Sequence, residues 1–232
     1  MLLGPDDLAI VALSLKVSGV AMAVALPLAF ALAYLLARGR FPGKALVDAI
    51  VHLPLVLPPV VTGWLLLLAF GRNGPVGGWL ESQFGISVMF RWTGAAIAAA
   101  IMALPLMVRA IRLSIESVDR RLEGAARTLG AGPWRTFATI TLPLSMPGVL
   151  AGLVLGFARS IGEFGATITF VSNIPGETRT LPIAIYSALQ IPGNDGTVFR
   201  LASIAVALSL VALILSEWLA RRGTDHKDRH VL

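Results

Sequence analysis

The sequence predicts an all-α membrane protein with about five transmembrane helices. Hydrophobic residues fill 56% of its 232 positions and charged residues only 14%, whereas a soluble domain carries about 25% charged residues. The apolar residues also occur in blocks long enough to cross a bilayer core, which takes about 20 helical residues. This composition argues against a soluble enzyme and excludes a disordered or fibrous protein.

Five apolar segments satisfy this length. In chain order they are Leu8–Ala37, Ala45–Phe70, Gly94–Leu113, Leu144–Val171 and Phe199–Ala220. Together they define one transmembrane domain, residues 8–220, followed by a charged cytoplasmic tail, residues 221–232. No Lys or Arg precedes Lys16, so the first segment lacks the basic start of a cleavable signal peptide and is interpreted as part of the mature protein.

The distribution of Lys and Arg between the spans predicts the orientation. One set of connections carries thirteen of them, namely Arg38, Arg40, Lys44, Arg109, Arg112, Arg120, Arg121, Arg127, Arg135, Arg221, Arg222, Lys227 and Arg229. The opposite set carries five, namely Arg72, Arg91, Arg159, Arg179 and Arg200. Because cytoplasmic loops are enriched in cations, we expect the N-terminus outside and the C-terminus inside. The net charge of +6 follows from this bias, and we expect no nucleic-acid partner.

Two spans carry residues that are unusual for simple lipid anchors. The second contains Pro54, Pro58 and Pro59, and because proline removes a backbone donor, this helix must bend or break. The fourth has a small residue at every fourth position, a pattern that lets another helix approach closely or reflects ordinary bundle packing. These residues are Gly148, Gly152, Gly156 and Ser160.

Arg159 and Glu163 are charged residues inside the fourth predicted span. At 1.5 Å per residue Arg159 lies about 22 Å from Leu144, in the outer half of the membrane. Charges at such depth pair or line a watery cavity, and the i,i+4 spacing allows this pair to form. The two residues either fix the bundle or form a gate near a passing dianion, where Thr167 and Thr169 would add hydroxyl donors.

The connection 117–143 between the third and fourth spans is long and mixed in charge. Asp119 to Leu129 predicts a short amphipathic helix with Arg120, Glu123 and Arg127 exposed. Gly130 and Gly132 can end this helix, and Pro133 can begin another. Such a helix is either a solvated interfacial helix or a docking element for a soluble partner.

This connection resembles the EAA motif of permease subunits in bacterial ABC importers. That motif runs Glu-Ala-Ala, three residues, Gly, nine residues and Ile-x-Leu-Pro. The matching residues here are Ala125, Ala126, Gly130, Ile140, Leu142 and Pro143. Gly124 occupies the position of the motif's Glu, and Glu123 stands one residue earlier. A shift of one residue rotates a helical side chain by about 100°. The ionic role of the motif's Glu is therefore not assigned to Glu123.

Within that superfamily the chain is similar to the molybdate permease branch over nearly its whole length. The similarity lies in 13–18, 41–45, 52–61, 105–112, 157–182 and 216–220, and Ser172–Thr180 discriminates best against sulfate permeases. The resemblance implies a type I ABC importer permease fold in a bacterial cytoplasmic (inner) membrane. It also implies a homodimer, a cytoplasmic ABC ATPase dimer and a periplasmic oxyanion-binding protein as partners, with lipid around the bundle.

The sequence is consistent with an ATPase that forms a separate subunit. No lysine stands in a Gly-x-x-x-x-Gly-Lys-Ser/Thr loop, so we expect no ATP site, no enzymatic activity of its own and no cofactor. Without cysteine there is no thiolate nucleophile or Cys-based metal site. His52 lacks carboxylates at ligand spacing, and we expect no metal.

Three alternatives remain open from the sequence. The cargo is molybdate, tungstate, or sulfate and thiosulfate, because selectivity in this design lies largely in the delivering protein. A different class would be an anion carrier or channel that works without ATP. Many secondary carriers are built from inverted repeats, and none is evident in five spans.

Overall fold

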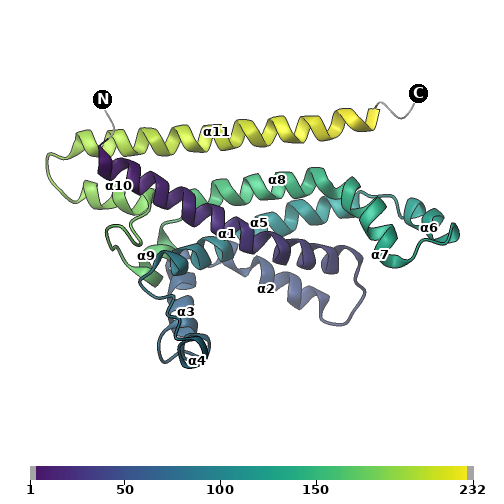
Figure 1. Cartoon of the computed structure of the whole chain (residues 1–232), viewed down its shortest axis with the longest axis horizontal. Helices are drawn as coiled ribbons and strands as arrows, with labels where there is room; N and C mark the ends of the chain where they lie inside the picture. The colour runs from purple at the N-terminus through teal and green to yellow at the C-terminus, as the bar shows by residue number, and fades with distance from the viewer. Residues whose placement is uncertain (1–3, 229–232) are drawn as a thin grey trace.

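The computed structural model describes residues 4–228, apart from the side chains of Pro5 and of residues 216–228, and every regular element in that range is a helix (Figure 1). In chain order these are α1 (Pro5–Arg38), α2 (Lys44–Val56), α3 (Pro59–Phe70), α4 (Pro75–Phe84), α5 (Trp92–Glu116), α6 (Arg120–Thr128), α7 (Pro133–Thr136), the π-helix η1 (Phe137–Thr141), α8 (Leu142–Ile161), α9 (Gly165–Val171), α10 (Leu181–Leu189) and α11 (Asp195–Asp228).

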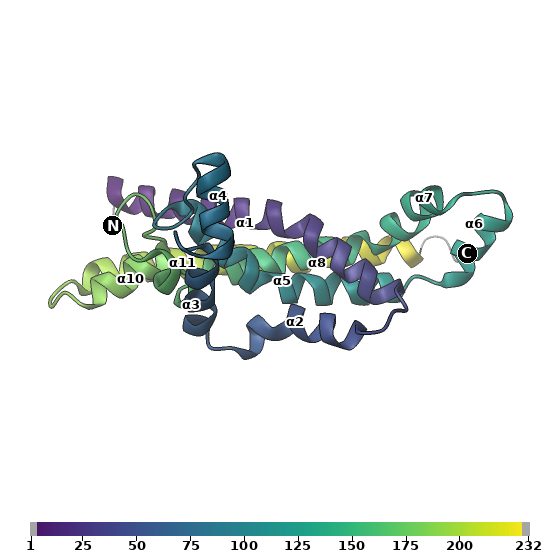
Figure 2. The ribbon, with the colours of Figure 1, turned by 90° about the horizontal axis from the view of Figure 1, so that it is seen from below.

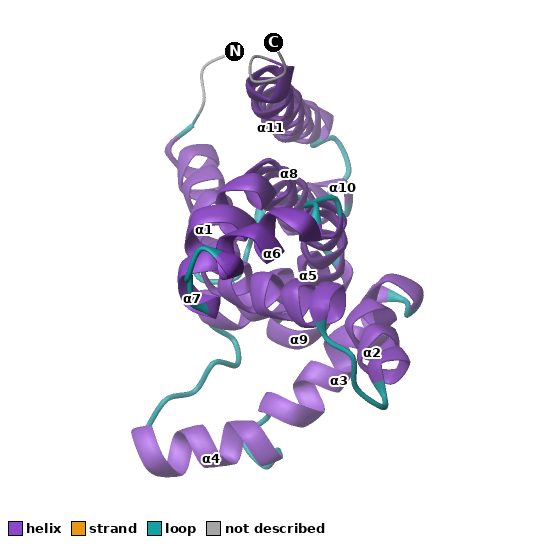
Figure 3. Ribbon diagram, turned by 90° about the vertical axis from the view of Figure 1, so that its right-hand side faces the viewer, coloured by secondary structure: helices purple, strands orange, loops and turns teal. Residues whose placement is uncertain are grey.

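Helix α5 lies at the centre of the bundle, between α1 and α8 (Figure 3). The residues that fill its interfaces are small: Ala95, Ala98, Ala99 and Ala103 are almost completely buried. Without bulky side chains the neighbouring backbones approach closely, which is how membrane helices gain packing energy when lipid is as apolar as the helix itself. Helix α11 runs along the outside of this core, against α8 and α10.

The number of crossings agrees with the prediction. Within residues 4–228 four helical segments are long and apolar enough to span a membrane, or five where the bent pair α2–α3 counts as one span, and the prediction of about five lies in this range. The first and third predicted spans lie inside the slightly longer α1 and α5. Helix α11 begins before the predicted Phe199 and continues past Ala220, so the predicted tail starts as helix, and residues 229–232 lie outside the described part.

The proline-rich second span is broken, as predicted. Helix α2 ends at Val56, α3 begins at Pro59, and the two axes differ by 116°. Pro58 and Pro59 cannot donate to the preceding turn, and the residue before a proline avoids the helical region; accordingly Leu57 is extended, with φ −69° and ψ 141°. Helix α3 therefore leaves the bundle and carries α4 away from it (Figure 3).

The predicted boundaries of the fourth span, 144–171, are wrong at both ends. The helix starts at Pro133 and runs through η1 to Ile161 as one 29-residue segment. Pro143 has no N–H to donate to the Thr139 carbonyl, and the turn before it widens into a π-helix, a common response to such an interruption. The helix then stops at Gly162, and α9 is a separate short helix.

The two ends of the bundle carry different elements. The α1–α2 connection, α6 and α7 lie at one end, here named the α6 end, and α10 with the α9–α10 connection lies at the other, the α10 end (Figure 2). Arg38, Arg40 and Lys44 thus gather at the same end as the arginines of α6. This is the arrangement that the predicted five-span topology requires.

Candidate functional site

The predicted docking segment forms a short helix that lies outside the core. The Asp119 carboxylate caps α6 by accepting the Arg121 backbone N–H at 2.8 Å, and no residue of α6 is buried. The helix ends at Leu129, and Gly130 follows with φ +88°, a left-handed conformation that favours glycine. The exposed surface is apolar and basic, because Leu129 is 88% exposed, Trp134 is 82% exposed and Arg120 and Arg127 point to solvent.

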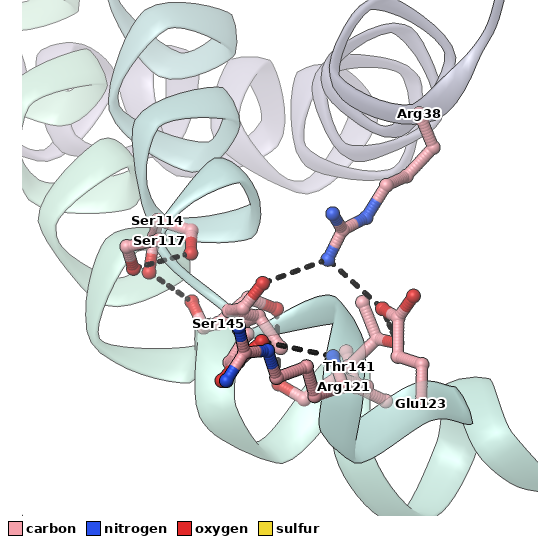
Figure 4. A network of polar contacts seen from close by, with 10 residues as sticks. Arg38, Ser114, Ser117, Arg121, Glu123, Thr141 and Ser145 are labelled. Carbon is pink, nitrogen blue, oxygen red and sulfur yellow. Dashed lines mark hydrogen bonds and ion pairs between the residues drawn. The ribbon is translucent and has the colours of Figure 1, made fainter. Parts of the chain in front are cut away.

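Glu123 does not belong to this exposed surface, contrary to the sequence prediction. Its Oε1 atom accepts hydrogen bonds from the Arg38 guanidinium of α1 at 2.9 Å and from the Thr141 hydroxyl of η1 at 2.8 Å (Figure 4). The Arg38 and Glu123 side chains are only 12% and 15% exposed. The carboxylate therefore points inward because two donors from different elements compensate its desolvation. Gly124, at the motif's Glu position, faces open space.

An aromatic cluster strengthens the same junction. The ring of Phe137, in η1, lies edge-on to Phe30 and Tyr34 of α1, with centroids 5.8 and 5.4 Å apart. The Trp134 ring also lies edge-on to Phe137, with ring centroids 6.4 Å apart. The second half of the motif, with Ile140 in η1 and Leu142–Pro143 at the start of α8, thus lies directly behind α6. The motif residues form one continuous junction between α6 and the membrane helix.

The two interruptions in the second and fourth spans contact each other. A Cβ atom built on Gly165, at the start of α9, would lie 2.7 Å from the Pro59 Cβ of α3. A Cβ atom on Gly63 would lie 2.6 Å from the Ala166 carbonyl oxygen and 2.8 Å from the Thr169 Cβ. Discontinuous helices that meet inside a membrane bundle are typical of substrate sites and gates in transporters. The sequence indicated the first interruption but not the second.

Arg159 and Glu163 pair beside this junction. Arg159 Nη1 lies 2.7 Å from Glu163 Oε2, and the Glu163 side chain is only 2% exposed. The other carboxylate oxygen accepts the Ala166 backbone N–H at 2.8 Å, which caps α9. One carboxylate therefore joins the end of α8 to the start of α9. Its charge is compensated on one oxygen by a guanidinium and on the other by a backbone donor.

The two threonines lie on different sides of α9. Thr167 is buried in the bundle interior beside a narrow gap that Glu163 also lines, together with Ser14, Ser18, Ser160 and Thr180. The hydroxyl of Thr169 instead donates to the Gly165 carbonyl at 2.8 Å, and its Cβ packs against Gly63. Of the predicted pathway residues, the structure thus brings Arg159, Glu163 and Thr167 together and separates Thr169 from them.

The small-residue ladder of α8 lies against α5. Cβ atoms on Gly148 and Gly156 would overlap Ser114 and Met107, at 2.1 and 2.7 Å, while one on Gly152 would lie 3.2 Å from Ile111. The Ser114 hydroxyl reaches the Ser145 carbonyl across the same contact at 3.3 Å (Figure 4). The α5–α8 packing therefore requires glycine at 148 and 156.

Sequence reasoning missed a charged cluster between α2 and α5. Arg112 pairs with Asp48 at 2.9 Å and with Glu116 at 2.8 Å, and these residues line a cavity of about 290 Å³ with His52 and Arg109. Asp48 lies one turn before His52, and its Oδ1 atom is 3.4 Å from His52 Nδ1. The prediction that His52 has no carboxylate at ligand spacing was therefore wrong. In the described part of the chain no group of three His, Asp or Glu side chains is placed to hold a metal ion.

These features define a class of protein: a multi-pass membrane protein with two interrupted helices and a short exposed helix outside the bundle. The family model for the inner membrane component of binding-protein-dependent transport systems matches residues 25–224, and the chain belongs to that family. The "Molybdenum transport system permease protein ModB" of Escherichia coli K12 is 57% identical over 229 residues, which cover 99% of this chain and all of the relative.

The chain is also similar to a sulfate permease and to a solved ABC transporter. The "Sulfate transport system permease protein CysT" of Escherichia coli K12 is 38% identical over 199 residues, which cover 84% of this chain and 71% of that protein. A solved bacterial alginate ABC transporter, in complex with its alginate-bound periplasmic protein, has a chain that superposes with a TM-score of 0.74 at 19% identity. The match covers 94% of this chain and 80% of that one. At this identity the likeness shows the fold, which is that of an ABC importer permease.

Proposed function

We propose that this chain is the membrane-spanning subunit of an ATP-driven importer that carries molybdate across the bacterial cytoplasmic membrane. The observation that carries the proposal is the continuous helix Pro133–Ile161. It begins beside the exposed docking segment and ends at the interrupted helices. A displacement imposed at α7 therefore reaches Gly162 along one helical segment, which includes the π-helical turn η1, and this is what coupling of transport to ATP hydrolysis requires.

A separate ATPase subunit docks at α6 and supplies the energy. Leu129 and Trp134 are large apolar side chains held in solvent, and buried aromatic anchors commonly dominate protein interfaces. Arg120, Arg121 and Arg127 are exposed on the same short helix, while the Asp119 and Glu123 carboxylates are engaged within the subunit. The complementary surface is an apolar pocket with an acidic rim. The permease subunit itself performs no catalysis.

The α6 end faces the cytoplasm and the α10 end faces outward. The cation excess at the α6 end supports this orientation, and it puts the docking segment where ATP is available. The α9–α10 connection and α10 then face the delivered cargo, so a binding protein outside the membrane docks at that end.

Two copies of the chain enclose the pathway. Helices α3 and α4 project from the bundle and expose large apolar side chains, namely Trp64, Leu65, Leu68, Val76, Trp79 and Phe84. A second copy, related by a two-fold axis, would cover this projecting arm isologously. The interrupted helices of each copy, with Arg159 and Glu163 beside them, then face the gap between the copies.

The cargo assignment is supported by the identity to the molybdenum permease, which is 57% over the whole chain against 38% for the sulfate permease over a shorter part. Molybdate, tungstate and sulfate are all tetrahedral dianions. A gate with one cation–carboxylate pair separates anions from cations, whereas fine selectivity belongs to the delivering protein.

The test is oxyanion uptake into vesicles that hold the complete complex of permease, ATPase and binding protein. We expect molybdate uptake that requires ATP and the binding protein. Competition by unlabelled tungstate and sulfate identifies the cargo: stronger inhibition by sulfate than by molybdate would replace molybdate with sulfate. Uptake that persists without ATP would overturn the importer assignment in favour of a carrier or channel.

A further inference from the structure

Helix α1 makes its hydrogen bonds and ion pairs with other elements near its two ends, and the Lys16 ammonium also lies 3.7 Å from the Trp92 ring of α5. At the α6 end Arg38 bonds Glu123 at 2.9 Å and the Val118 carbonyl at 3.3 Å. At the α10 end Asp7 pairs with Arg200 of α11 at 2.7 Å, and the Ser14 hydroxyl accepts the Leu181 backbone N–H, at the start of α10, at 2.7 Å. The helix between these contacts is continuous from Pro5 to Arg38.

The middle of α1 presents a smooth surface to α5. Ala21, Ala25, Ala29 and Ala33 recur at every fourth position and are at most 2% exposed. Alanine has no side-chain rotamer to interlock with a neighbour, so a small axial displacement of α1 changes this α1–α5 packing little. Interlocking side chains of α1 lie instead at the α6 end, where Phe30 and Tyr34 pack against Phe137 of η1. Sliding of packed helices is one of the recognised modes of conformational change in proteins.

The contacts at the two ends, in contrast, are specific and largely buried. Glu123 is 15% exposed and Arg38 12% at one end, and Asp7 is 6% exposed at the other. Charge-assisted hydrogen bonds of this kind hold a fixed geometry, and removal of one partner leaves the other charge desolvated. A displacement of α6 is therefore passed to Arg38, and a displacement of α1 is passed to α10 and α11.

We propose that α1 is a second transmission path from the docking segment to the α10 end, with Arg38 as the positioning residue that connects it to α6. The first path runs through the continuous helix Pro133–Ile161 to the interrupted helices. Through α1 the same movement of α6 reaches the segments that follow the α9–α10 connection. This inference rests on the proposed function, because it assigns α6 to the ATPase and the α10 end to the binding protein.

The inference predicts a specific change in the stimulation of ATP hydrolysis. Stimulation of ATP hydrolysis by the loaded binding protein requires a signal from the α10 end to α6. If α1 carries part of that signal, loss of the Arg38–Glu123 contact weakens stimulation more than it weakens basal hydrolysis or assembly. Coupling free energies between protein sites correspond to about 5-fold to 150-fold effects, and we expect at least about a 5-fold loss of stimulation.

The experiment uses the complete complex in lipid vesicles. The variants are Arg38→Gln, Glu123→Gln and the charge exchange Arg38→Glu with Glu123→Arg. The matched control is Glu116→Gln, because Glu116 pairs with Arg112 of the same helix, α5, at 2.8 Å, and its loss breaks no Arg–Glu contact between elements. The measurements are ATPase retained per permease, basal hydrolysis, and hydrolysis with loaded binding protein. The two single variants should lose stimulation, the exchange should recover part of it, and the control should match the wild type.

A cross-linking experiment tests the Arg38–Glu123 contact in complexes that have already folded and assembled. The chain contains no cysteine, so Arg38→Cys with Glu123→Cys introduces the only two thiols of this subunit. A short bifunctional thiosulfonate then replaces the lost contact by a covalent, reducible one in complexes that are already assembled. Stimulation should be low in the reduced form, recover on cross-linking and fall again on reduction.

The outcomes separate the inference from the function on which it rests. Equal stimulation in the reduced, cross-linked and wild-type forms, with normal ATP-dependent uptake, overturns the role of α1 and leaves the importer assignment intact. Absence of ATP-dependent uptake in the wild-type complex overturns the importer assignment itself. A loss of stimulation that cross-linking does not reverse also contradicts the proposal, because the contact would then matter only for folding.

Discussion

Gly165 and Pro59 touch so closely that a side-chain carbon on Gly165 would lie 2.7 Å from the Pro59 Cβ. Pro59 begins α3 after the interruption in the second span, and Gly165 begins α9 after the interruption in the fourth. The contact joins two helix breaks that are about one hundred residues apart in the chain. It places them at one depth in the bundle, beside the Arg159–Glu163 pair.

Gly165→Val should force the two breaks apart. Overpacking of a close contact costs about 1–3 kcal/mol, and the displaced α9 would carry the Ala166 N–H away from the Glu163 carboxylate that accepts it. We expect a lower melting temperature of the purified subunit and a larger loss of uptake per assembled complex. Gly162→Ala is the matched control, since its Cβ would meet nothing nearer than 3.9 Å and should leave both measurements close to wild type.

The Arg159–Glu163 pair should affect transport more than assembly. Glu163→Gln keeps an oxygen for the Ala166 N–H but removes the charge that faces Arg159, so we expect altered basal ATP hydrolysis or uptake with the fold preserved. Arg159→Leu should lower uptake per complex further. The measurement is uptake normalised to assembled complex. Wild-type values in both variants would mean that the pair only stabilises the bundle, where breaking a buried pair costs about 3–5 kcal/mol.

Gly130→Val should uncouple the ATPase. Gly130 has φ +88°, and a β-branched residue in a sparsely populated backbone region costs roughly 1–3 kcal/mol. We expect the variant to reach the membrane, to retain less ATPase on purification and to lose uptake.

Gly43→Val provides the comparison for Gly130→Val. Gly43 also has a left-handed conformation, with φ +86°, open space around it and a position in the α1–α2 turn at the same end of the bundle. The variant carries a similar strain away from α6, so it should keep the ATPase bound. Equal retention of ATPase in the two variants would contradict the assignment of α6 as the docking segment.

The orientation can be tested with a reporter enzyme that is active only outside the cytoplasm. A fusion after Gly74, between α3 and α4, should be active, whereas fusions after Arg121 of α6 and at the C-terminus should be inactive. The thirteen-to-five distribution of Lys and Arg is the physical reason, because cationic connections stay in the cytoplasm. Activity at Arg121 would reverse the orientation and remove the basis for ATPase docking at α6.

Much of this architecture follows from local properties that a sequence displays directly. The thickness of the bilayer sets the length of an apolar helix, so five long apolar blocks predict five crossings. The missing N–H of a proline is equally local, and Pro54, Pro58 and Pro59 predict that the second span bends or breaks. The break lies at Pro58 and Pro59, whereas Pro54 remains inside α2. The left-handed turn at Gly130 and the new helix at Pro133 likewise follow from residues that are adjacent in the chain.

Other features depend on contacts between residues that are far apart in the chain, and only the tertiary structure decided them. The fourth span ends at Gly162, and the short helix α9 that follows packs against Pro59 and Gly63 of α3, about one hundred residues earlier in the chain. Glu123 points inward because Arg38, 85 residues earlier, and Thr141, 18 residues later, both donate to it. A helical pattern specifies which face of α6 carries Glu123, but the donors that meet that face are supplied by other elements.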